Sequence, residues 1–354
     1  MRAGARLPTS SMPPSPTSSR RRTLLFAILL APLLLVAIAW TGGALYYTFP
    51  VPSLRVASAI AFVAGSLVAL VVVRKKRWAL VAIALGVAAT LGWFLSMEPR
   101  NDRNWRPELA VTPWADVDGD RVTVHRVRNF DYRTPDDFDV RYEDKVFDLK
   151  RLEGVDVFYS YWDGNESVAH TMFSWDFGGP DVLCLSVEVR REIGQEAGGL
   201  PGMFHQFEIL YILADERDVV RLRTNYRKEQ VFLIRTVATP DEGRRLLLDV
   251  LAKVNRLRDE PEFYRTIGNN CTTSIVGHVN AIWPGRIPYT KKILMNGYAP
   301  ELAYATHLHA TDLPFDEWKR RAHVDAAALA ADRDPLFSRR IRAGLPSMPP
   351  TEPR

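Results

Sequence analysis

Residues 56–73 read VASAIAFVAGSLVALVVV, and this stretch contains no charged side chain. About 18 consecutive apolar residues are enough for a helix to cross the hydrocarbon core of a bilayer. Apolar runs of similar character lie on either side of it, at about 23–47 and 79–95. We therefore predict three transmembrane helices within residues 23–97.

Basic residues flank these runs unevenly. Arginines occupy positions 20–22, and RKKR fills the loop at 74–77, whereas the loop at 50–55 has Arg55 as its one base. Because positively charged flanks stay in the cytoplasm, residues 1–22 are predicted to be a disordered cytoplasmic tail of an inner-membrane protein. Everything after the third run then lies outside the cytoplasm. A cleaved signal peptide is the alternative for the first run, but that run is long and two more follow it.

The charge balance argues against nucleic acid as a partner. Of the chain's 46 Lys/Arg and 41 Asp/Glu, residues 1–100 hold 11 and one. That leaves 35 bases and 40 acids for the rest of the chain, a net charge of −5. The basic excess therefore belongs to the membrane region and not to the folded domain.

Beyond the third run, residues 98–120 are expected to be a linker, residues 121–312 an α+β domain, and residues 313–354 a helical tail. Alternating or β-branched runs predict strands at 122–130, 155–162, 168–177, 182–189, 206–213, 219–224 and 230–237. The polar stretch ADERD at 214–218 predicts a turn that joins two of them in a hairpin. Apolar positions with helical spacing predict helices at 240–257 and 270–282. The fold expected is a mostly antiparallel sheet with a few helices.

Cys271 is the residue whose setting most suggests chemistry. It lies in GNNCTT at 268–273, directly before a helical apolar pattern. If Asn269 or Asn270 caps the helix, Cys271 falls in the first turn, where the helix dipole and unpaired amides favour a thiolate. The same amides can stabilise an oxyanion. The alternative is a small buried residue at a helix end.

A cysteine nucleophile needs a base, and His170 is the best candidate among seven histidines. Its apolar and aromatic neighbours in VAHTMFSW, at 168–175, would hold it rigidly. The alternative is a hydrogen-bonded core histidine. His278 lies two helical turns from Cys271, too far to touch the sulfur. Structural or surface roles are expected for the others: His125, His205, His307, His309 and His323.

Neither a metal nor another cofactor is expected, since the sequence has no HExxH and no CxxC. The second cysteine, Cys184, is expected to be a buried strand residue. A disulfide between Cys184 and Cys271 remains open, and it would argue against a nucleophilic thiol.

Several separated segments resemble one known family, the Lnb-type N-terminal periplasmic domains of membrane-anchored acyltransferases. The resemblance extends over about residues 101–283. The segments that carry it are DVFYSYW at 156–162, AHTMFS at 169–174, LSVEVRRE at 185–192, ADERDVVRLR at 214–223 and NNCTT at 269–273.

The resemblance implies a permuted papain-like fold, in which the histidine strand precedes the cysteine helix. It implies Cys271 as nucleophile, His170 as base, and an acyl-thioester formed from an ester of a membrane lipid or lipoprotein. Glu188 shares a strand face with Ser186 and is the candidate to orient the imidazole. An ion pair between Glu188 and Arg190, Arg221 or Arg223 is the alternative.

Two other functions stay open. One is a cysteine peptidase or amidase of the NlpC-like kind that acts on cell-wall peptides, which an exposed cleft without an apolar rim would favour. The other is a membrane-tethered scaffold without activity, which a buried thiol far from His170 would favour. The pair Arg221 and Arg223, with Tyr226 and Arg227 beyond, can bind a phosphate or carboxylate, although a solvated strand face is the simpler interpretation.

Overall fold

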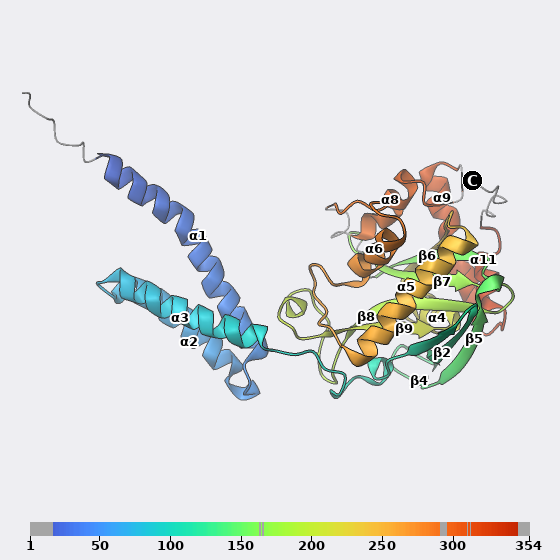
Figure 1. Ribbon diagram of the computed structural model, residues 1–354, viewed down its shortest axis with the longest axis horizontal. Coiled ribbons are helices and arrows are strands. Elements are labelled where there is room, and N and C mark those ends of the chain that lie inside the picture. The colour runs from blue at the N-terminus through green and yellow to red at the C-terminus, as the bar shows by residue number, and fades with distance from the viewer. Residues whose placement is uncertain are drawn as a thin grey trace, which may run out of the picture. The chain divides into compact units, whose positions relative to one another are not determined.

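The computed structural model describes residues 17–162, 164, 166–290, 296–309, 311 and 313–345. It divides into two compact units at the bond between Met97 and Glu98 (Figure 1). The expectation for residues 1–16 of the tail lies outside the described residues, whereas residues 17–22 are helical.

The first unit consists of three long helices, α1 (Thr17–Thr48), α2 (Arg55–Val72) and α3 (Lys76–Leu95). Each contains a stretch long and apolar enough to cross a membrane, as predicted. Small residues let the helices approach closely, because a Cβ at Gly42 would lie 2.6 Å from Val63 and one at Gly86 would lie 2.5 Å from Phe62. The first unit is therefore a packed set of three apolar helices, each long enough to span a membrane.

The second unit is built on one twisted sheet with strand order β1-β2-β9-β8-β7-β6-β10, and β5 pairs with β2 outside this path. All pairs are antiparallel except β2 with β9. The strands are β1 (Trp114–Asp118), β2 (Arg121–Arg128), β5 (Tyr142–Asp148), β6 (Gly154–Tyr161), β7 (His170–Asp176), β8 (Val182–Arg190), β9 (Glu208–Ala214) and β10 (Gln230–Arg235). A small separate sheet pairs β3 (Asp131–Tyr132) with β4 (Phe138–Asp139).

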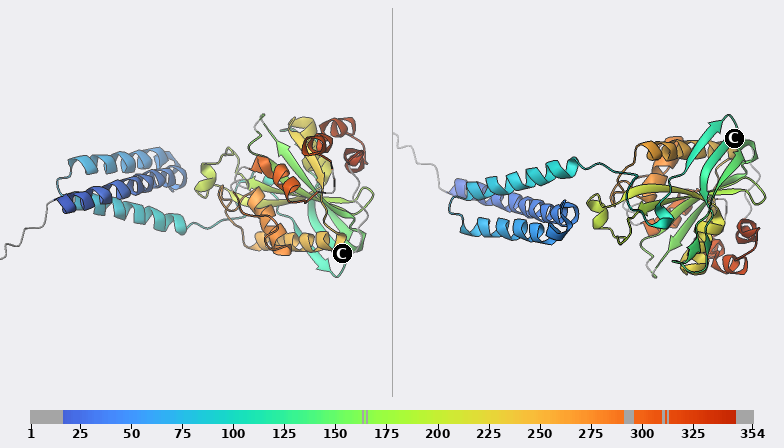
Figure 2. Two further views of the ribbon diagram at one scale, coloured as in Figure 1. Left: turned by 90° about the horizontal axis from the view of Figure 1, so that it is seen from above. Right: turned by 90° about the horizontal axis from the view of Figure 1, so that it is seen from below.

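Helices cover both faces of this sheet. One face packs on α5 (Pro240–Asp259) and α6 (Cys271–Ile282), and α9 (Phe315–Ala322) adds Trp318 to the same core. The other face packs on α4 (Glu216–Arg221), α10 (Asp325–Ala330) and α11 (Phe337–Arg342). Figure 2 shows α5 and α11 on opposite sides of the sheet. The chain thus has three apolar helices followed by a mixed α+β unit, as predicted.

The predicted hairpin across 214–218 is wrong. Residues 216–221 form α4, and residues 222–226 continue as a π-helix, η5 (Leu222–Tyr226). The Asp215 side chain caps α4 by accepting a hydrogen bond from the amide of Arg217. Apolar and charged residues alternate here as in a surface strand. The charged residues are nevertheless buried, because each forms an ion pair with an acidic residue far away in the sequence.

Residues on both sides of the expected domain pack into it. In 98–120, expected as a linker, Trp105 and Leu109 are buried and β1 joins the sheet. In 313–354, expected as a separate tail, Phe337 and Ile341 of α11 are buried in the core of the second sheet face. One compact unit therefore starts at Glu98 and includes α11.

Candidate functional site

Helix α6 begins at Cys271, as its sequence predicts. Asn270 is the N-cap: its side-chain oxygen accepts the amide hydrogen of Thr273 at 3.0 Å, and its own amide donates to Thr273 Oγ1 at 2.9 Å. The Asn270 side chain also donates to the carbonyl of Thr266 at 2.8 Å. Cys271 is therefore fixed at the positive end of the helix dipole, where a thiolate is stabilised.

His170 opens β7 and meets two side chains of the neighbouring strand β8. Its Nε2 lies 2.7 Å from Ser186 Oγ and 3.4 Å from Glu188 Oε1. Ser186 Oγ in turn donates to Glu188 Oε1 at 2.6 Å. Because the Ser186 proton goes to Glu188, the Ser186 oxygen accepts from His170, which places a proton on Nε2. The His170 ring also forms a hydrogen bond with the Cys271 side chain, which acts on the pKa of both groups.

Glu188 is held from the other side by Arg223. Arg223 Nη2 donates to Glu188 Oε1 at 2.8 Å, and its Nη1 donates to the carbonyl of Val219 at 2.8 Å. Arg223 reaches Glu188 from the π-helix, a rare backbone form that is frequent at functional sites. Glu188 thus contacts the imidazole and forms an ion pair with Arg223, so its position is compatible with both interpretations.

The electrostatics of the site favour a charged pair. Burial alone would lower the pKa of His170, but the charge of Glu188 and the hydrogen bonds with Cys271 and Glu188 act together against it and raise the pKa to about 9. Burial would raise the pKa of Cys271, but the hydrogen bond and charge of His170 lower it below its ordinary value. The arrangement therefore shifts the pair toward a thiolate beside an imidazolium, the reactive state of a cysteine–histidine pair.

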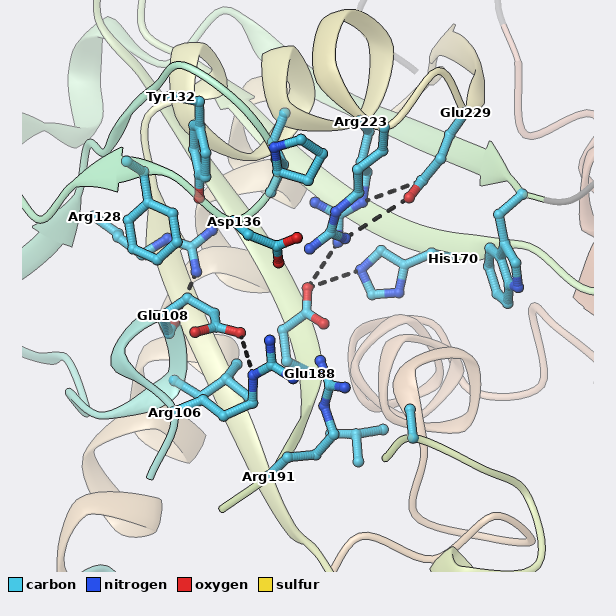
Figure 3. A pocket seen from close by; sticks show the side chains of 18 of the residues that line it. Arg106, Glu108, Arg128, Tyr132, Asp136, His170, Glu188, Arg191, Arg223 and Glu229 are labelled. Carbon is cyan, nitrogen blue, oxygen red and sulfur yellow. Dashed lines mark hydrogen bonds and ion pairs between the residues drawn. The ribbon is translucent and has the colours of Figure 1, made fainter. Parts of the chain in front are cut away.

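A pocket of about 540 Å³ borders this site (Figure 3). His170 and Glu188 form part of its wall, together with Trp162 and a group of arginines. Figure 3 shows the imidazole and the Glu188 carboxylate facing each other across the dashed contact at the edge of the pocket. A ligand in this pocket would lie against the histidine.

The other candidates have structural partners. His278 is buried, with Nδ1 2.6 Å from Asp249 and Nε2 2.9 Å from the Tyr211 hydroxyl. Cys184 is buried in β8 and is a free thiol, as is Cys271, so the two do not form a disulfide. Burial raises the pKa of Cys184 well above its ordinary value, which makes it a poor nucleophile.

Sequence reasoning missed Tyr264 and the arginines Arg106 and Arg191. Burial, and then the charge of Cys271, raises the pKa of the Tyr264 hydroxyl, so this group is coupled electrostatically to the cysteine. Arg106 and Arg191 line the pocket from segments 85 positions apart in the chain. No spacing in a single sequence points to such contacts.

Replacing Glu188 with glutamine is expected to lower the pKa of His170 from about 9 towards about 7, because a nearby opposite charge is typically worth about 1–3 pH units. NMR titration of ring-labelled histidines in the full-length protein measures this value, with His170→Ala to assign the signal. The His278 signal serves as the internal control. An unchanged titration of His170 would mean that Glu188 does not set its charge state.

Residues 138–297 match the family model described as the Lnb N-terminal periplasmic domain, a little under half of the chain. Searches among curated proteins and among solved structures gave no significant match. Together with the three apolar helices, the family match identifies a membrane protein with a periplasmic domain.

Proposed function

Because residues 138–297 match the Lnb N-terminal periplasmic domain, we propose that this protein is a membrane-anchored cysteine acyltransferase or hydrolase that acts on lipid or lipoprotein esters. The observation that carries the proposal is the pair of Cys271 and His170, with opposite pKa shifts and a hydrogen bond between them. The order of its parts, histidine strand before cysteine helix, supports a permuted papain-like fold.

The proposed reaction has two halves. In the first, the Cys271 thiolate attacks the ester carbonyl, and the alcohol leaves with the proton of the His170 imidazolium. In the second, the neutral His170 takes a proton from an amine or water, which attacks the thioester and releases the Cys271 thiolate. The enzyme ends in its starting protonation state, and the acyl group has moved to the amine or water.

Backbone amides in the first turn of α6 would stabilise the negative charge on the carbonyl oxygen. The Asn270 side chain accepts a hydrogen bond from the amide of Thr273. The amides of Cys271 and Thr272 come directly before it in the first turn of the helix. Such fixed donors are worth about 3 kcal/mol each at a developing oxyanion. Glu188 acts as a positioning residue that holds the imidazole and its charge.

An apolar rim beside the site favours a lipid substrate over a cell-wall peptide. Ile193, Leu200, Met203 and Ile267 are large apolar residues, all of them about half exposed or more. The loop that contains the first three lies next to the segment that contains Ile267, because Thr266 Oγ1 donates to the carbonyl of Gly199 at 2.6 Å. The loop at 193–204 therefore packs on the segment that leads into the cysteine helix, and its apolar side chains are available to a membrane surface.

The flanking charges support the topology of the proposal. The arginines at 20–22 precede the apolar stretch of α1, and basic residues join α2 to α3, so both segments would lie in the cytoplasm. Three crossings from a cytoplasmic N-terminus would put the second unit on the periplasmic side of the inner membrane. Substrate would then come from the outer leaflet of that membrane.

Replacing Leu200 with aspartate is expected to reduce acyl release from vesicles about tenfold or more, because it removes apolar contact with lipid and adds a charge. Hydrolysis of a water-soluble short-chain ester should stay unchanged, since Leu200 lies in the rim and not at the sulfur. Leu329→Asp, at another exposed leucine on α10, is the matched control. Equal losses with both esters would argue against a membrane-contact role.

The function is tested with full-length protein in phospholipid vesicles that contain a lipidated peptide with a free amine. Release of lysophospholipid with acylation of the amine would support transfer, and release of free fatty acid would support hydrolysis. Cleavage of added muropeptides without any change in the lipids would replace the proposal with a peptidase. If the lipids do not change and Cys271 is unreactive, a membrane-tethered scaffold without activity is the remaining function.

A further inference from the structure

The pocket beside His170 contains more cations than its own carboxylates neutralise. Six lining side chains are basic: Arg106, Arg128, Arg191, Arg223, Arg227 and Lys228. Three of these have a carboxylate at 2.7–2.8 Å, in the pairs Arg106–Glu108, Arg128–Asp218 and Arg223–Glu188. The other three are not neutralised in this way.

Arg191 is the most informative of those three. It is half-buried at the end of β8, and it forms no ion pair with any residue that the structure describes. Burial, and then the like charge of Arg106, lowers the pKa of Arg191. A guanidinium in such a place is unfavourable until an anion joins it. Lys228 is also without an ion pair among the described residues, and Arg227 has only a contact of 3.7 Å with Glu229.

The backbone places Arg106, which pairs with Glu108 through Nε, on the same wall of the pocket as Arg191. The amide of Arg106 donates to the carbonyl of Arg191 at 3.0 Å. Figure 3 shows both side chains reaching toward Glu188 from the same end of the pocket. Guanidinium groups on one wall of a pocket can bind the oxygens of a phosphate through paired hydrogen bonds.

We propose that this pocket binds the phosphate of a phospholipid headgroup and so presents one of the lipid's acyl esters to His170 and Cys271. The inference rests on the proposed function and names its acyl donor. The volume of about 540 Å³ lies in the range of small-ligand sites. Val189 and Ala197 also line the pocket, and they flank the start of the exposed apolar loop at 193–204, so a headgroup here has an apolar surface next to it for its chains.

Binding is measured without turnover, on full-length Cys271→Ala protein in an uncharged maltoside detergent. Isothermal titration calorimetry follows the soluble headgroup sn-glycero-3-phosphoglycerol. A second substitution, Arg191→Gln, in this Cys271→Ala protein is expected to weaken binding of the headgroup about tenfold or more, because a charge-assisted pair of hydrogen bonds is lost. Arg227→Gln should act in the same direction, and Asp136→Asn, which removes a carboxylate from the pocket, should tighten binding.

The matched control is Arg258→Gln, since Arg258 is an exposed arginine at the end of α5 that pairs with Asp259. It should bind as the parent does. Equal binding with and without Arg191, or equal binding of glycerol, overturns the proposal. Tighter binding of inorganic phosphate would assign the pocket to free phosphate, and tighter binding of an acidic tripeptide would assign it to a peptide carboxylate. Because the test protein lacks the thiol, failure here is distinct from failure of acyl transfer at Cys271.

Discussion

Replacing Cys271 with alanine is expected to lower acyl release from phospholipid vesicles about 10³-fold or more, the scale of loss when a covalent nucleophile is removed. The reason is local: Cys271 holds the first position of α6, where the helix dipole and the His170 imidazolium both stabilise its thiolate. The rate of lysophospholipid formation by full-length protein measures the effect.

Cys184→Ala is the control for this substitution. Cys184 is the other free thiol, buried in β8 with a raised pKa, and it belongs to the core on the sheet face opposite to the one on which Cys271 packs. It should keep its acyl-release activity, although a small cavity will cost some stability. If Cys184→Ala lost activity and Cys271→Ala kept it, the assignment of the nucleophile would be wrong.

Replacing Arg342 with alanine is expected to destabilise the second unit by about 3–5 kcal/mol, because it leaves buried carboxylates without a partner. Arg342 of α11 donates to Asp156 of β6 at 2.8 Å and to both oxygens of Glu216 at 2.6 and 2.7 Å. All three side chains are buried. Thermal unfolding of the full-length protein in detergent, followed by near-ultraviolet circular dichroism, should show a midpoint lower by about 10 °C.

Arg340→Ala tests whether this loss comes from burial. Arg340 lies two positions away on the same helix, pairs with Asp334 at 2.9 Å and is largely exposed. Exposed pairs contribute about 0–1 kcal/mol, so its midpoint should barely move. Similar shifts for both variants would show that α11 is held by something other than the buried network.

Local patterns predicted much of the site. Period-two alternation placed Ser186 and Glu188 on one face of a strand, and both now contact His170. The NNCTT segment predicted a capped helix start, and Asn270 makes that cap. These features depend on neighbours within a few residues, which a single sequence shows directly.

The parts that could not be predicted depend on partners far along the chain. The alternation in 219–224 is typical of a strand, but Arg221 pairs with Asp131 and Arg223 with Glu188, and these pairs allow a buried helix. In the same way, the network of Arg342 makes the C-terminal segment part of the core. The position of the partner of each charged side chain decides whether such a segment is buried. A single sequence does not show that position.

The most direct test of the central claim is the mass of Cys271 itself. Full-length protein incubated in phospholipid vesicles is quenched and digested, and the peptide that contains Cys271 is weighed with and without hydroxylamine, which cleaves thioesters. We predict an added acyl mass on Cys271 that hydroxylamine removes, with a smaller yield in His170→Ala. An unmodified Cys271 peptide under conditions in which lipid is consumed would contradict acyl-thioester chemistry at this site.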